Sequence, residues 1–135
     1  MFNKNKIEKF DNKCFIVKIK PETISERGIY GAARWAWRAK LERVKKSDYV
    51  LAVKIGSGGE VVGVLEPEKW YKATAENDKK YGHNLNEGCS EETEKRIAFI
   101  GKEAPEHIKN KYLHKYLPDE FMKKGDKSVF RYTYS

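Results

Sequence analysis

The segment 29–38, Ile-Tyr-Gly-Ala-Ala-Arg-Trp-Ala-Trp-Arg, combines two tryptophans, Trp35 and Trp37, with two arginines, Arg34 and Arg38. Rings stack on flat ligands and guanidinium groups bind phosphates, so this combination is typical of a binding surface. At about 100° per residue in a helix, Trp37 lies on the apolar stripe and Trp35 points about 160° away from it. We therefore expect Trp37 in the core and Trp35 in a site for a flat or anionic ligand.

Other basic and aromatic residues extend this candidate site. Lys and Arg side chains would hold phosphates, while aromatic rings would stack on an extruded base or surround it. The sequence equally allows Trp70 or Tyr71 to belong to the core. The candidate nucleic-acid-binding residues are Lys18, Lys20, Tyr30, Arg34, Trp35, Arg38, Trp70, Tyr71 and Arg131.

The histidines and cysteines offer weaker patterns. His107 and His114 would share a face of one helix, but Lys111 lies on the same stripe and would repel a metal ion, so we expect no metal site. His83 and Cys89 share a polar segment whose glutamates would disfavour a thiolate. We expect no catalytic residue and no cofactor.

Charge and composition narrow the class of protein. The 135 residues suit one domain, and the net charge of +8 makes a polyanion such as nucleic acid the first partner to consider, ahead of a membrane surface. Two cysteines form no disulfide framework, and no apolar run approaches the length of a membrane span or a signal peptide. These features predict a cytoplasmic protein without a membrane partner.

The order of elements predicts an α+β fold in one domain, 1–135. Gly56–Gly59 is expected to be a hairpin turn, because no Lys-Ser/Thr follows it and no helix begins there. A polar loop or flap is expected at about 74–95, and the first and last strands must find partners across the chain, in a sheet that curls towards a barrel. Strands are expected at 14–20, 48–55, 60–66, 96–100 and 128–134; a connector at 22–28; and helices at about 31–46, 105–116 and 118–125.

Four short strings carry a resemblance to a known family: Phe15-Ile-Val-Lys18, the segment 29–35, Tyr49-Val-Leu-Ala-Val-Lys54 and Val61-Val-Gly-Val-Leu-Glu66. Over about residues 14–73 the chain resembles the PUA-like superfamily, in particular its EVE and YTH branches and, less closely, ASCH domains. The resemblance implies a small mixed or antiparallel β-barrel flanked by helices. It also implies recognition of RNA, or of a modified base in RNA or DNA.

The resemblance also assigns roles to residues. Lys18 would correspond to the family's strand-end lysine, and Tyr30, Arg34 and Trp35 to the loop-to-helix region that supplies pocket groups. The sequence thus predicts a nucleic-acid-binding module that recognises a modified or extruded base through an aromatic pocket ringed by Lys and Arg. Two alternatives stay open. One is an enzyme of nucleic-acid or nucleotide metabolism with the 74–95 segment and His83 as a lid, and the other is a small interaction protein of a mobile element or restriction system.

Overall fold

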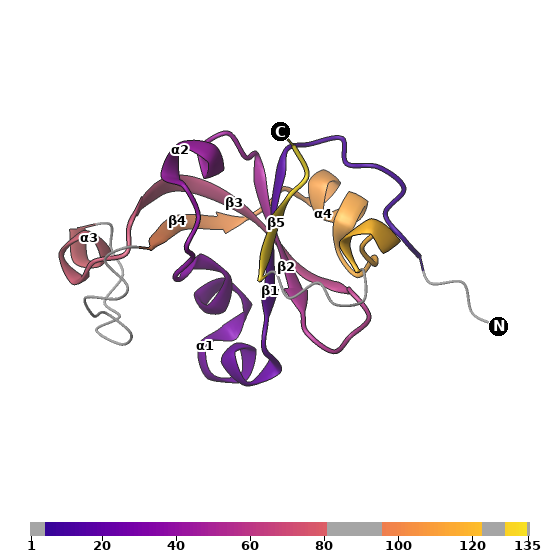
Figure 1. Cartoon of the computed structure of the whole chain (residues 1–135), viewed down its shortest axis with the longest axis horizontal. Coiled ribbons are helices and arrows are strands. Elements are labelled where there is room, and N and C mark those ends of the chain that lie inside the picture. The colour runs from indigo at the N-terminus through magenta and orange to yellow at the C-terminus, as the bar shows by residue number, and fades with distance from the viewer. Residues whose placement is uncertain (1–4, 81–95, 123–128, 135) are drawn as a thin grey trace.

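Five strands form one mixed sheet in the order β4-β3-β2-β1-β5 (Figure 1). The computed structural model describes residues 5–80, 96–122 and 129–134 of the chain. The strands are β1 (Cys14–Ile19), β2 (Tyr49–Lys54), β3 (Val61–Lys72), β4 (Ile97–Glu103) and β5 (Phe130–Tyr132). The helices are α1 (Pro21–Arg34), α2 (Leu41–Val44), α3 (Ala75–Lys80), α4 (Glu106–Tyr112) and a short 3₁₀ helix, η2 (Asp119–Phe121).

Strand β1 lies inside the sheet, between β2 and β5. Its sequence, Cys-Phe-Ile-Val-Lys-Ile, is rich in aromatic and β-branched residues that pack well on a pleated surface, and only Lys18 is not fully buried. It pairs in parallel with β2 and antiparallel with β5. The pairing of the first strand with the last confirms the expectation that they meet across the chain, and the tight β2–β3 hairpin is confirmed as well.

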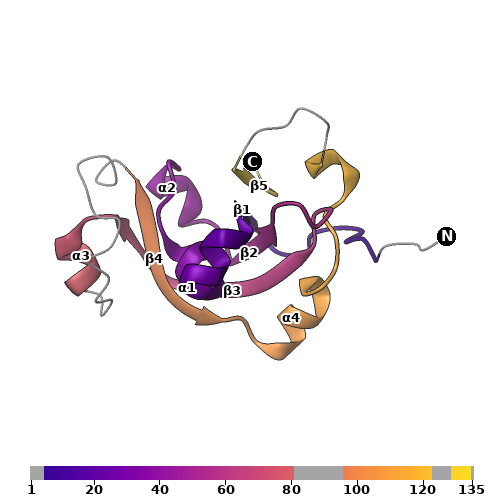
Figure 2. The same ribbon diagram turned by 90° about the horizontal axis from the view of Figure 1, so that it is seen from below.

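Alternating side chains of the sheet face two separate layers of core. Phe15, Val17 and Ile19 face the cluster that contains Ala32 and Ala33 of α1. Cys14 and Ile16 face the opposite cluster, which contains residues of α4 and η2. Figure 2 shows α1 and α4 on opposite sides of β3, so the sheet is covered on both faces.

The expected helix over 31–46 is wrong. Helix α1 begins at Pro21, occupies the expected connector 22–28, and ends at Arg34. Gly28 adopts φ 75° and ψ 169°, a conformation open to glycine, and divides α1 into two helical pieces. Trp35 is extended, with φ −140° and ψ 135°, because the chain next runs along β4, where Trp37 N–H and C=O both bond to Ile97 at 2.9 Å.

The expected barrel is also wrong, because the sheet stays open, whereas the α+β class and the mixed sheet are confirmed. The two edge strands, β4 and β5, do not pair with each other. Groups from α1 and the segment after it occupy the β4 edge instead. Arg34 Nε donates to Phe99 O at 3.2 Å, and Gly101 N–H donates to Tyr30 Oη at 3.0 Å. These contacts occupy backbone groups that strand pairing along this edge would need to close a barrel.

Smaller differences concern the ends of elements. Strand β3 continues through Pro67 to Lys72, past the expected end at 66, because β4 pairs along its whole second half. Helix α4 stops at Tyr112 rather than 116, and η2 covers only part of the expected 118–125 helix. Residues 81–95 and 123–128 lie outside the described part of the chain. No helix in the described ranges is long and apolar enough to cross a membrane.

Gly101 gives a test of the β3–β4 pairing. It lies opposite Pro67 beside a bulge, and a Cβ there would lie 2.3 Å from the backbone oxygen of Glu66. We expect Gly101→Ala to lower the free energy of unfolding by about 2 to 3 kcal/mol, because backbone cannot move aside easily. Urea denaturation measures this loss. The neighbouring exposed Lys102→Ala serves as a control, with an expected change of about 0.5 kcal/mol or less; equal effects would contradict the tight approach.

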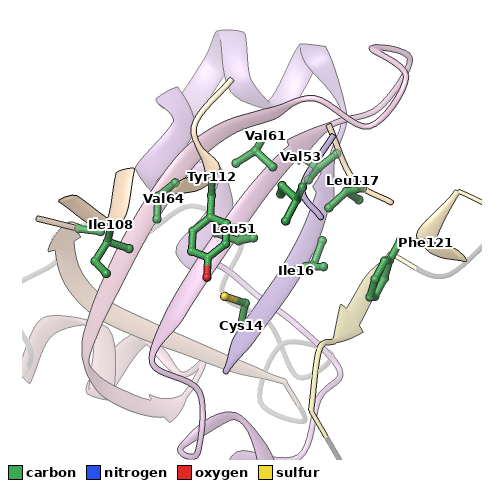
Figure 3. Packing of buried hydrophobic residues seen from close by; sticks show 12 residues of the cluster. Cys14, Ile16, Leu51, Val53, Val61, Val64, Ile108, Tyr112, Leu117 and Phe121 are labelled. Atoms are coloured by element: carbon green, nitrogen blue, oxygen red, sulfur yellow. The ribbon is translucent and has the colours of Figure 1, made fainter. Parts of the chain in front are cut away.

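Cys14 lies next to Tyr112 in the α4-side core (Figure 3). The pKa of this thiol is raised from 9.0 to about 12, first by burial and second by the charge of Asp48, while a hydrogen bond with Tyr112 partly offsets both effects. The folded chain therefore holds Cys14 as a neutral thiol at neutral pH. A neutral buried thiol is a poor nucleophile, so Cys14 belongs to the packing of the core.

The raised pKa of Cys14 predicts a loss of stability at alkaline pH. Below pH 9 the thiol is neutral in both states, whereas between pH 9 and about 12 it ionises only in the unfolded chain, so stability falls as pH rises. We expect Cys14→Ala to make the slope shallower by up to about 1.4 kcal/mol per pH unit in this window. Urea denaturation across pH 7 to 11 compares the two proteins; parallel slopes would contradict the assignment.

Candidate functional site

A pocket of about 430 Å³ lies between the end of β1, the first half of α1 and the segment that follows α1. We call it the basic pocket. Its volume falls in the range of small-ligand sites. The described residues that line it are Lys18, Ile19, Lys20, Thr23, Arg27, Ala32, Trp35, Ala36, Trp37 and Arg96.

Three chain segments bring the polar groups of the basic pocket together. Lys20 directly follows β1, and Thr23 and Arg27 lie one turn apart on the first piece of α1. Arg96 comes from the start of β4. Its carbonyl accepts a hydrogen bond from Ala73 N–H at 2.9 Å, and the next residue is paired with Trp37. Backbone hydrogen bonds therefore fix the position of Arg96 opposite α1.

The electrostatics of the basic pocket are one-sided. Within the described ranges, no carboxylate forms an ion pair with Lys20, Arg27 or Arg96. The ion pairs found there involve other cationic residues. No Asp or Glu occurs among the described lining residues. Concave sites lined by one sign of charge concentrate ligands of the opposite sign. The basic pocket is thus suited to an anion.

Two buried hydrogen-bond donors on lining residues add to this character. Trp35 Nε1 and Arg96 Nε are buried without a hydrogen-bond partner among the described residues. Trp37 differs, because its Nε1 donates to Ala33 O at 2.8 Å. A buried donor left unpaired costs about 1 to 3 kcal/mol, which a ligand acceptor that reached it would recover.

The burial of the two tryptophans reverses the expectation from helical angles. Trp35 is only 8% exposed and packs with Tyr71, Ala73 and Ala98. Trp37 is half-buried at the margin of the α1-side core. The assumed helix does not reach either residue, so the 100° spacing does not apply to them. Both residues nevertheless line the basic pocket.

Arg34 and Tyr30 hold the fold together instead of lining the basic pocket. The Arg34 side chain is fully buried, its Nη2 donates to Tyr71 Oη at 2.7 Å, and its guanidinium lies 5.0 Å from the centre of the Trp35 ring. Tyr30 Oη accepts the Gly101 N–H. Both residues connect α1 to the β3–β4 pair, Arg34 as a buried residue and Tyr30 as a half-buried one.

Other candidate residues also lie apart from the basic pocket. Trp70 and Tyr71 are core residues, and Trp70 packs against Phe99 with ring centres 4.8 Å apart. Arg38 is exposed but does not line the pocket.

Two candidate basic residues, Lys18 and Arg131, are directed to the α4 side of the sheet. Both contact Phe121: Lys18 Nζ donates to its carbonyl at 3.2 Å, and the Arg131 guanidinium lies 5.2 Å from its ring centre. Lys18 also borders the basic pocket, but its position along β1 places its side chain on the same face as Cys14 and Ile16.

Three lining residues of the basic pocket, Thr23, Arg27 and Arg96, are not among the binding residues expected from the sequence. A signal for the first two exists, because Pro21 is favoured in the first turn of a helix, and a helix from Pro21 places Thr23 and Arg27 on one face. No local pattern indicates Arg96. Its neighbours in the basic pocket are about 60 to 75 residues away in the sequence, so only long-range pairing brings it there.

The candidate catalytic groups do not assemble in the described structure. His107 is exposed on α4, whereas His114 lies beyond the end of that helix at φ 64°, with its Nδ1 3.5 Å from Glu60 Oε2. No group of three or more metal-ligating His, Cys, Asp or Glu side chains occurs in the described ranges. His83 and Cys89 lie outside the described residues.

The burial of Arg34 predicts that this residue stabilises the fold, and a substitution can test this role. We expect Arg34→Ala to lower the free energy of unfolding by about 3 kcal/mol, since it leaves Phe99 O and Tyr71 Oη without their donor. The exposed Arg38→Ala should change it by about 0.5 kcal/mol or less. Chemical denaturation measures both. An Arg34→Ala protein of unchanged stability would contradict this role.

Comparison of the chain with protein-family models, with curated proteins and with solved structures finds no match. What the basic pocket binds is therefore derived from its own residues.

Proposed function

We propose that this protein is a nucleic-acid-binding module and that the basic pocket holds one nucleotide of the strand. The observation that carries this proposal is the meeting of Lys20, Arg27 and Arg96, without carboxylate partners among the described residues, around one small pocket. Cations in such a site attract phosphates and release the counterions of the strand. The net charge of +8 supports long-range attraction of the same partner.

Aromatic groups in the same pocket favour nucleic acid over a simple inorganic anion. The half-buried Trp37 lines the pocket beside the three cations. An indole ring provides a surface for stacking of a base or sugar, and such stacking contributes about 1 to 3 kcal/mol per base. A pocket with both cations and a ring matches the two chemical parts of a nucleotide.

The finer proposal is that the nucleotide carries a modified or extruded base. It is supported by the resemblance of residues 14–73 to EVE and YTH domains, in which the pocket lies near the first helix and has aromatic walls. The basic pocket occupies the corresponding part of this chain, since it lies between the end of β1, α1 and Trp35–Trp37. The open sheet differs from the barrel of those families. Binding measured with modified and unmodified strands of one sequence separates this proposal from general binding.

Salt dependence tests the general proposal. We expect a labelled single-stranded oligonucleotide to bind in about 50 mM salt and to weaken steeply as salt rises. The triple variant Lys20→Gln/Arg27→Gln/Arg96→Gln should bind at least about tenfold more weakly and lower the salt slope by about 0.7 to 1.4, since each neutralised phosphate contributes about 0.7 on single strands and one nucleotide is flanked by at most two phosphates. Fluorescence anisotropy measures both quantities.

Lys13 provides a matched control for Lys20. The two exposed lysines flank the six-residue β1 on opposite ends, about 20 Å apart. Lys13→Gln removes the same charge far from the basic pocket and should leave affinity within about twofold. If Lys13→Gln weakened binding as much as Lys20→Gln, the attraction would belong to the overall charge. If neither RNA nor DNA bound at low salt, in single- or double-stranded form, the proposal would be refuted.

A further inference from the structure

The side-chain hydrogen-bonding groups of the residues that line the basic pocket are nearly all donors. Its described side chains contribute the ammonium of Lys20, the guanidinium groups of Arg27 and Arg96, and the indole of Trp35, none of which can accept a hydrogen bond. Thr23 offers the one hydroxyl among them, and no Asn, Gln, Asp or Glu is present in that set. Base edges generally present donors as well as acceptors, so their recognition needs acceptors in the site. A phosphate group presents only acceptors when fully ionised.

The charge of the site points to the same group. Three cationic side chains converge on the basic pocket without an ion pair to a described carboxylate. A neutral base leaves this charge uncompensated, and an internal phosphodiester supplies one negative charge. A phosphomonoester carries about −1.5 to −2 at pH 7 and three acceptor oxygens. It therefore compensates more of the pocket's charge with one compact group.

The shape of the site favours a phosphate at the end of a strand over a phosphate within it. An internal phosphate is flanked by sugars on both sides and follows a surface, whereas a terminal phosphate projects from the chain and can enter a concavity. The basic pocket is a hollow that opens to solvent, and the buried Trp35 and the half-buried Trp37 are among its lining residues. Two of its lining residues, Trp35 and Arg96, each also carry a buried nitrogen, Nε1 and Nε respectively, that has no hydrogen-bond partner among the described residues.

We propose that the basic pocket takes a phosphomonoester, supplied by the phosphorylated end of a nucleic-acid strand or by a free nucleoside monophosphate. For strand ends, this inference rests on the proposed function above. Arg96 and Arg27 contact the phosphate oxygens, Lys20 adds charge at the mouth of the pocket, and Trp37 packs against the attached nucleoside. The preference lies in the terminal phosphate, so this inference is an alternative to recognition of a modified base in the same pocket.

The test compares four ligands with the full-length chain. One oligonucleotide sequence is prepared with a 5′-phosphate, with a 3′-phosphate and with hydroxyls at both ends, and adenosine 5′-monophosphate is the free nucleotide. We expect one terminal phosphate to raise affinity at least tenfold over the hydroxyl form, as measured by fluorescence anisotropy. Adenosine 5′-monophosphate should displace the phosphorylated strand, whereas adenosine should not.

Variants connect the preference to the basic pocket. Arg96→Gln and Lys20→Gln should each reduce the ratio of phosphorylated to hydroxyl affinity to threefold or less, while Lys13→Gln should keep the wild-type ratio. Thermal unfolding by circular dichroism confirms that each variant is folded, and Arg96→Lys provides a second variant that keeps the charge and should retain part of the ratio.

The outcomes distinguish this inference from the proposed function. Equal affinity for phosphorylated and hydroxyl strands would overturn the phosphomonoester inference and leave nucleic-acid binding standing. If adenosine 5′-monophosphate bound and no oligonucleotide did, the inference would stand for free nucleotides and the nucleic-acid proposal would fall. If none of the four ligands bound, the phosphomonoester inference would be overturned. The nucleic-acid proposal would fall with it if RNA and DNA also failed to bind at low salt in single- and double-stranded form.

Discussion

The buried guanidinium of Arg34 is the interaction on which the arrangement of this fold depends. A cation removed from water must be surrounded by acceptors or by the faces of aromatic rings. Arg34 meets this requirement by donating to Phe99 O on β4 and Tyr71 Oη on β3 while lying against the Trp35 ring. The end of α1 is thereby held at the edge of the sheet. Strand β4 is covered at that edge, and the sheet remains open.

The basic pocket is a consequence of the same connection. Parallel strands β1 and β2 cannot be joined by a tight turn, so the chain must cross one face of the sheet before it returns. Helix α1 makes that crossing, and the chain after Arg34 then runs beside the start of β4 through the Trp37–Ile97 pair. The residues that follow β1 consequently face Trp35, Trp37 and Arg96 across a hollow.

The described cationic residues of the chain fall into two groups, those with contacts inside the protein and those without, and composition alone does not distinguish them. Lys18, Arg34, Arg43 and Arg131 contact carbonyl groups or aromatic rings within the protein; the Arg43 guanidinium, for example, lies 3.9 Å from the centre of the Tyr132 ring. Their charge contributes to packing. Lys20, Arg27 and Arg96 have no such described contacts, so their exposed hydrogen-bond donors can serve a ligand. A net charge of +8 therefore overstates the number of cations available to a partner.

Local sequence determined the strands and the hairpin, because β-branched runs and a glycine turn act over a few residues. It also indicated Lys20 and Trp35, two of the residues that line the basic pocket. The course of the chain after Arg34 was decided by tertiary structure, since the bonds of Trp37 to Ile97 and of Arg34 to Phe99 span about 60 residues. These long-range bonds override the helical pattern of 31–46, bury Trp35 and bring Arg96 to the pocket. Sequence spacing carries no information about such partners, which only the folded sheet places side by side.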